Sequence, residues 1–272
     1  MKNTFKYAFA ALALTFSLTS CSSDDDSPAI TGNGDLVLEF DQAYGGDDLI
    51  FGATQTANSE GEVLKISSMK YIVSNIVLTK ADGTTYTYPK ADSYFVVDEA
   101  NEATHAITLE GIPAGNYTKV KFGIGVDQEQ YNLGAAGQGN FLATADAAGM
   151  LWTWAAGYRF VAFEGTYTSP SIDTDSPFMV HTGKSGANYN YVEVTLDLPT
   201  NGLVRETISP VVHIIADLSK ILDGTNKINL SENDGGAGAM IMGGDLLPLI
   251  TQNMPGVFTV DHVHNEEGAH GH

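Results

Sequence analysis

Histidines carry the clearest chemical potential in this chain of 272 residues. Four of the seven fall in the last twelve residues, DHVHNEEGAHGH: His262, His264, His270 and His272. Neutral imidazole is a good ligand for copper, zinc and nickel. His262 and His264 are two residues apart, so in an extended strand they lie on one face and can share an ion. His270 and His272 we expect in a disordered end that binds metal only weakly.

The other three histidines lie inside the chain. His181, in PFMVHTGKSG, ends a short apolar run, where a strand should stop and a loop begin, and such strand ends commonly carry ligands. His213, in VVHIIAD, lies on what reads as a core strand, so it is either a buried, hydrogen-bonded histidine or a ligand. His105, in EATHAIT, we expect at the surface.

Trp152 and Trp154 are the only tryptophans and stand two residues apart in GMLWTWAAGYRF, residues 149–160. If residues 150–154 are extended, Met150, Trp152 and Trp154 point to the same side. Composition alone then favours a hydrophobic plug under a loop.

Few other residues offer a cofactor site or a nucleophile. Five of the seven methionines either fill core gaps or supply thioether sulfur for Cu(I); they are Met150, Met179, Met240, Met242 and Met254. DTDS, at 173–176, resembles the start of a calcium-binding loop. Such a loop needs glycine at its sixth position and glutamate at its twelfth, whereas this chain has Phe178 and Lys184. A calcium ion held by a different set of ligands is the alternative that is left. No GxSxG motif is present, and nothing in the sequence indicates an enzyme.

The N-terminus has the pattern of a secretory signal over residues 1–20, with Lys2, Lys6 and an apolar stretch. LTSC, at 18–21, resembles the lipobox of bacterial lipoproteins, in which the cysteine is acylated and becomes the mature N-terminus. Cys21 is the only cysteine, which excludes disulfides. Residues 21–34 predict an acidic flexible tether that resembles the surface-export signal of Bacteroidetes lipoproteins. We therefore expect an outer-membrane lipoprotein anchored through Cys21, facing the periplasm or, preferably, the cell surface.

The charge of the mature chain argues against one class of partner. All 33 acidic residues but only 11 of the 13 basic residues follow the signal, which leaves an excess of 22 negative charges. Such a chain repels phosphate backbones, so we expect no nucleic-acid partner.

Apolar, β-branched runs separated by turn signals predict an all-β fold. We expect an antiparallel β-sandwich with long loops and one or two short helices, forming a single domain over 35–265 followed by the tail 266–272. GIPAGN, at 111–116, predicts a hairpin turn. Residues 133–149 predict a long loop, and KILDG and LLPLITQN predict short helices. The expected strands are 36–40, 71–79, 94–98, 106–110, 117–126, 158–165, 191–198, 203–208 and 211–218.

Several motifs, taken in order, resemble one known family. GMLWTWAAGYRFVAFEG, followed by FMVHTG, is similar to the MW-x-W-x-x-GY-x-F…EG and F-x-x-H-x-G signatures of the MbnP family of secreted copper-binding proteins. LVLEFDQAYGGDDL, LKISSMKYIVSNIVLT, DSYFVVDE, ITLEGIPAGNYTKVKFGIGVDQEQYN and IIADLSKILDG also fall in the family's order.

The resemblance implies a β-sandwich that binds one copper ion through imidazoles and a tryptophan oxidised to kynurenine, the oxidation being attributed in relatives to a dihaem peroxidase-like partner. Trp152 and Trp154 match the family's two tryptophans, and His181 matches its histidine. For a second imidazole we rank His264 and His262 above His213.

One departure stands near the start of the domain. Where the family's opening motif suggests a histidine, this chain has FDQAY, with Gln42. The leading hypothesis is a lipid-anchored copper-binding protein for copper capture, storage or handover. The alternatives are a structural or adhesive surface module without a metal site and, last, a hydrolase of surface glycans.

Overall fold

The computed structural model describes residues 30–266. The expected signal peptide, Cys21, most of the tether, His270 and His272 lie outside the described residues. Within residues 30–266, no helix combines the length and the apolar character that crossing a bilayer requires.

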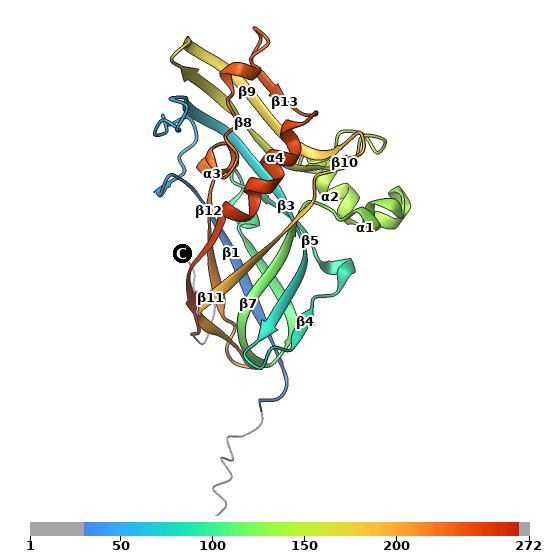
Figure 1. Ribbon diagram of the computed structural model, residues 1–272. Helices are drawn as coiled ribbons and strands as arrows, with labels where there is room; N and C mark the ends of the chain where they lie inside the picture. Colours follow the sequence, from blue (N-terminus) through green and yellow to red (C-terminus); the bar gives the residue numbers. More distant parts are fainter. Residues whose placement is uncertain (1–29, 267–272) are drawn as a thin grey trace, which may run out of the picture.

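The larger of two sheets has nine strands (Figure 1). Six of them follow the order β10-β9-β8-β3-β7-β11, while β4 and β5 pair with β3 and β13 pairs with β9. The long strand β3 is central because it pairs with four others. The bounds are β3 (Val63–Lys80), β4 (Thr85–Thr87), β5 (Tyr94–Asp98), β7 (Gly115–Ile124), β8 (Arg159–Ser169), β9 (Ile172–Ser185), β10 (Asn188–Tyr189), β11 (Val192–Val204) and β13 (Ala239–Ile241).

The smaller sheet has five strands, in the order β14-β12-β1-β2 with β6 also paired to β1. β1 and β12 run parallel, whereas β12 and β14 are antiparallel. The strands are β1 (Asn33–Tyr44), β2 (Asp47–Asp48), β6 (Ala106–Pro113), β12 (Val211–Asp217) and β14 (Phe258–His264).

The inner faces of the two sheets share one apolar core, as the alternating strands predict. In β11, Val194, Leu196 and Leu198 enter this core while the residues between them are exposed. Phe40 of the smaller sheet meets Phe122 of the larger one edge-to-face, with ring centroids 5.6 Å apart. The expected all-β sandwich is therefore confirmed.

Two local expectations are wrong. Residues 111–116 form no hairpin, because β6 pairs with β1 of the smaller sheet and β7 pairs with β3 and β11 of the larger sheet. The chain instead turns a corner between the sheets, held there by the amide of Ala114, which donates to the carbonyl of Gly32 at 2.9 Å. The expected strands at 191–198 and 203–208 are replaced by one strand, β11, which has an irregular register between Asp197 and Gly202 and ends at Val204, before residues 205–208.

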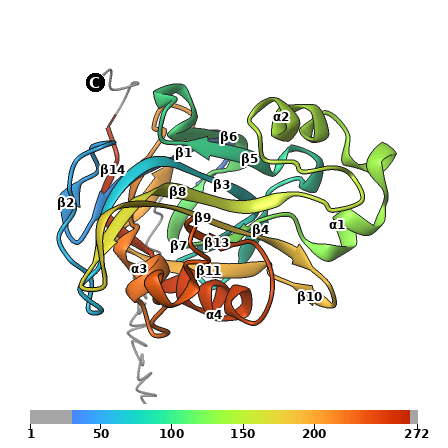
Figure 2. The same cartoon turned by 90° about the horizontal axis from the view of Figure 1, so that it is seen from above.

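Short helices decorate the sandwich: α1 (Gln128–Asn132), α2 (Phe141–Ala147), α3 (Ser219–Asp223) and α4 (Leu246–Asn253). Figure 2 shows α3 and α4 side by side, away from α1 and α2. The segment 133–149, expected to be a loop, contains α2, whose Phe141 and Ala145 pack in a second apolar cluster with Ile72 and Phe160. Burial of these two side chains explains why a glycine- and alanine-rich stretch becomes helical.

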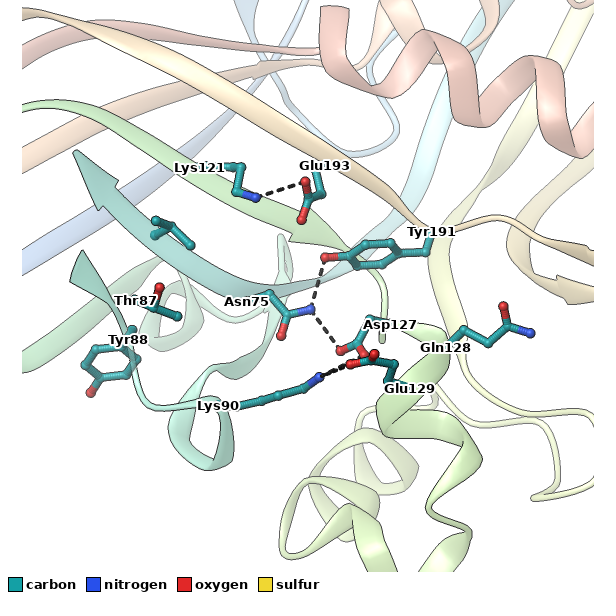
Figure 3. Close-up of a pocket in the computed structure, with 11 residues that line it drawn as sticks. Asn75, Thr87, Tyr88, Lys90, Lys121, Asp127, Gln128, Glu129, Tyr191 and Glu193 are labelled. Atoms are coloured by element: carbon teal, nitrogen blue, oxygen red, sulfur yellow. Dashed lines mark hydrogen bonds and ion pairs between the residues drawn. The ribbon is translucent and has the colours of Figure 1, made fainter. Parts of the chain in front are cut away.

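A polar network fixes the point where the chain leaves the larger sheet to enter this helical segment (Figure 3). The carboxylate of Asp127 caps α1 by accepting from the amide of Gln130 at 3.0 Å, and it also accepts from Asn75, Lys90 and Tyr94 at 2.7–2.9 Å. Burial alone would raise the pKa of Asp127, but these donors outweigh it and lower the pKa to about 2. The network therefore anchors the start of the segment that carries both tryptophans.

Candidate metal centre

Residues 150–159 form a tight hairpin at the end of the helical segment. The amide of Trp152 donates to Gly157 at 3.2 Å, and the amide of Arg159 donates to Met150 at 2.9 Å. Met150 is buried in the second apolar cluster, which ties the hairpin to the outer face of the larger sheet. Because the chain turns between residues 153 and 157, Trp152 and Trp154 do not share a face as they would in an extended strand.

Trp152 lies against His181 of β9. Their ring centroids are 6.2 Å apart, and the Arg159 guanidinium lies 5.5 Å from the Trp152 ring. His181 follows Phe178 and Val180, which point into the shared core, so its own side chain points to the outer face of the sheet. The hairpin covers it there, and only 2% of His181 is exposed.

One ring nitrogen of His181 is hydrogen-bonded to a carboxylate, and the other has no hydrogen-bond partner among the described residues. Nε2 lies 2.6 Å from Oε1 of Glu164 on β8, and since a carboxylate only accepts, Nε2 carries the proton. Nδ1 is buried and has no hydrogen-bond partner among residues 30–266. Burial lowers the pKa of His181 more than Glu164 raises it, which favours neutral imidazole. This is the protonation state that a metal ligand needs, with a carboxylate orienting the ring from behind.

Gly183 lets Trp152 come this close. A Cβ at position 183 would lie 2.5 Å from the carbonyl oxygen of Tyr158 and 3.1 Å from Cζ3 of Trp152. The close packing of the hairpin on β9 therefore requires a residue without a side chain, which gives a physical reason for glycine in the HTG sequence.

Trp154 has a packing role. Its ring lies 5.1 Å from that of Tyr131 and 6.2 Å from that of Tyr158, and it packs against the second apolar cluster. The sequence left open which tryptophan faces an imidazole, and the geometry distinguishes them: Trp152 contacts His181, and Trp154 contacts tyrosines.

The methionines divide into two groups. Met150 and Met254 are buried in apolar clusters. Met179, two residues before His181, is paired with Met240 of β13, and Met242 follows directly after the end of that strand. Met240 and Met242 are 45% and 36% exposed. Of these three, Met179 lies on the same face of β9 as His181, because the two are two residues apart in one strand.

His213, His262 and His264 gather elsewhere. One ring nitrogen from each lies within 4.8 Å of the others, and this is the only such group of three or more histidine, cysteine or acidic residues among those described. The three lie on the outer face of the smaller sheet, because their neighbours Val212, Ile214 and Val263 contact the shared core. The core separates them from His181, so the structure does not bring all the expected ligands to one ion.

Burial lowers the pKa of His213, and Glu39 partly opposes this while His262 and His264 add to it. His105 was expected at the surface, but it is half-buried near this group, with Nε2 3.2 Å from the carbonyl oxygen of Asp98.

The structure also places Gln42, where the family motif suggests a histidine, and the DTDS sequence considered for calcium. Gln42 points inward, is 6% exposed and donates to the hydroxyl of Tyr71 at 2.9 Å. It therefore faces neither group of imidazoles, and the departure from the family at this position falls in the core. Asp175, in the sequence considered for calcium, pairs with Lys65 at 2.7 Å instead of joining a group of carboxylates.

Comparison with known proteins gives the family. The family model of MbnP matches residues 33–242, most of the chain. The chain belongs to the MbnP family. The solved structure of MbnP from Methylosinus trichosporium is similar at 18% sequence identity and a TM-score of 0.49, over 75% of this chain and 82% of that one. No curated protein matches the chain.

Within the MbnP match lie Trp152, Trp154, His181 and His213. His262 and His264 lie beyond its end at residue 242. Sequence analysis did not assign a role to Glu164, although it is the glutamate of the EG motif. Its position on β8, two residues from the partner of His181, became clear only from the strand pairing.

Proposed function

We propose that this MbnP-type protein binds copper outside the cytoplasm, anchored to the outer membrane through an acylated Cys21 and facing the cell surface. Its role is copper capture, storage or handover and not catalysis. The observation that carries the proposal is the buried Nδ1 of His181, which lacks a partner in the described chain and lies beside Trp152. Family membership supports copper as the ion, since the family that the motifs resemble binds copper.

The donors around His181 suit copper in its reduced state. Imidazole is acceptable to both oxidation states, whereas thioether sulfur selects Cu(I). Met179 shares the outer face of β9 with His181, and Met242 follows the end of β13, whose Ile241 pairs with Val180 next to His181. We assign Nδ1 of His181 and a thioether from this edge as ligands.

Trp152 is the tryptophan that we assign to oxidation. Indole N–H can only donate, whereas the aromatic amine of kynurenine offers a nitrogen that can bind metal. Conversion needs an external oxidant, and a dihaem peroxidase-like partner using peroxide is the class that the family resemblance implies. Trp152 contacts His181 at the sheet edge, while Trp154 is packed against Tyr131 and Tyr158.

The test uses protein purified from its native host. We expect about one copper ion per chain bound at this site, together with oxidised Trp152 in the peptide containing residues 150–159. Trp152→Phe and His181→Ala should each remove this copper. Trp154→Phe is the matched control, since it changes the neighbouring indole and should leave the copper in place.

Two results would contradict the proposal in different ways. If copper is bound but both indoles are intact, the kynurenine assignment is wrong and the copper site stands. If no copper is bound in wild type, or if copper is unchanged in His181→Ala, the assigned centre is wrong and the structural-module hypothesis gains support.

A further inference from the structure

We propose that His213, His262 and His264 form a second metal site, which binds a borderline divalent cation, Zn²⁺ or Cu²⁺. This inference goes beyond the copper centre at His181 and does not depend on it. Two of the three ligands lie in β14, outside the residues that the MbnP family model matches.

A β-bulge turns the two C-terminal histidines toward His213. Across β12 and β14, His213 is level with His262, but Ile214 is level with Val260, so Asp261 is an extra residue in β14. Before the bulge Phe258 and Val260 contact the shared core, and after it Val263 does. Without the extra residue, regular alternation would turn His262 and His264 inward with Val260. The bulge shifts the phase and places both imidazoles on the outer face, as bulges at functional sites commonly do.

The three imidazoles are close enough to share an ion once one of the two stacked rings turns its lone pair toward the others. Nε2 of His262 lies 2.9 Å from Nε2 of His264, so one ring donates to the other. The rings of His213 and His262 are stacked with centroids 4.2 Å apart. In a tetrahedral site with metal–nitrogen bonds of about 2.0–2.1 Å, neighbouring nitrogens are about 3.3 Å apart. Replacing the shared proton by a cation thus requires His262 and His264 to separate by only a few tenths of an ångström.

Carboxylates stand behind two of the three rings. Nδ1 of His213 lies 3.2 Å from Oε2 of Glu39, and Nδ1 of His262 lies 2.6 Å from Oδ2 of Asp261. A proton held on Nδ1 leaves Nε2 as the metal-binding nitrogen, which is the usual arrangement of histidine ligands backed by carboxylates. Glu39 is therefore a positioning residue for His213.

The imidazoles open onto an acidic hollow of about 540 Å³. Glu39, Asp41 and Glu102 line it together with the three imidazoles, and within residues 30–266 no lysine or arginine does. Converging carboxylates concentrate cations, and one of them or a water molecule can complete the coordination.

Donor chemistry separates this site from the one at His181. Three imidazoles with carboxylates nearby favour zinc or Cu(II), and in the described part of the chain no thioether lines the hollow to favour Cu(I).

The experiment titrates the full chain carrying His270→Ala and His272→Ala, which removes the imidazoles of the tail. ZnCl2 and CuCl2 are added in separate calorimetric titrations at neutral pH, and Cu²⁺ is also followed by its nitrogen couplings in electron paramagnetic resonance. We expect saturable binding that falls at least about 100-fold when His262→Ala and His264→Ala are added. Glu39→Gln should weaken binding about 10–100-fold while the unfolding temperature of the metal-free chain stays unchanged.

Two control variants separate this site from its neighbours. His181→Ala should retain the Zn²⁺ site, so failure of the copper centre leaves this result intact. His105→Ala, which changes a histidine of the same hollow outside the group of three, should also retain it. Equal affinity of the parent and the paired His262 and His264 variant for both cations would overturn the proposal, and so would equal losses in His105→Ala and the paired variant.

Discussion

The contact between Gly183 and the Trp152 hairpin gives the sharpest test of how the fold builds the His181 centre. In Gly183→Ala, the new Cβ would be 2.5 Å from the carbonyl oxygen of Tyr158, closer than real Cβ contacts by about half an ångström. The obstacle is backbone, so it cannot rotate away, and the hairpin must move from β9. Overpacking of this kind costs about 1–3 kcal/mol. The new Cβ would also lie 3.1 Å from Cζ3 of Trp152, so Trp152 should move with the hairpin.

Two measurements follow this displacement. Urea unfolding should show a loss of about 1–3 kcal/mol, and Cu(I) affinity should fall by at least about tenfold, equivalent to about 1.4 kcal/mol. Gly235→Ala is the matched control, because a Cβ there meets nothing within 4 Å. If Gly183→Ala unfolds and binds copper as Gly235→Ala does, the glycine does not set the position of Trp152 and the steric argument fails.

Three further predictions follow from single residues. Asp127→Asn should lower the unfolding free energy by about 2 kcal/mol at pH 7, and the exposed Asp146→Asn serves as a neutral control. The pKa of Asp127 is lowered from 3.8 to about 2 in the folded chain, so wild type keeps this stabilisation above pH 4 and loses it as the pH falls toward 2. A stability deficit of Asp127→Asn that persists at pH 2 would contradict the argument. Glu164→Gln should weaken copper binding about 10–100-fold without preventing folding, as copper titration of the folded variant would show. Cys21→Ser should move the protein from the membrane fraction to the soluble fraction, and unchanged fractionation would exclude the lipid anchor.

Alternation of apolar residues was sufficient to predict most strands and the sandwich. β5 has the expected bounds 94–98, and the inward face of β11 follows the pattern of Val194, Leu196 and Leu198. The pairing of the strands was harder to predict than their positions, because two strands joined by a turn-like sequence can belong to different sheets. The corner at 111–116 shows this: its local signals suit a hairpin, and only the hydrogen bonds of β6 to β1 decide otherwise.

The candidate sites depended on the same non-local information. Local spacing predicted that His262 and His264 share a face, but it could not say that Asp261 forms a bulge and turns both outward, since a bulge is defined by the partner strand. Trp152 and Trp154 are likewise indistinguishable by composition. A four-residue turn separates their environments, giving one an imidazole neighbour and the other tyrosines.

The arrangement of the two sites has a physical consequence for how the protein handles metal. His181 and Met179 lie on the outer face of one sheet, the three imidazoles lie on the outer face of the other, and the apolar core lies between them. A cation cannot pass through that core without losing its ligands, and a bare charge there is strongly disfavoured. Exchange between the sites must therefore go through solvent or through a partner. Because the donors proposed for the two sites favour different oxidation states, the sites need not compete for the same ion: Cu(I) would be retained beside His181 and Met179, and divalent cations would be retained in the acidic hollow.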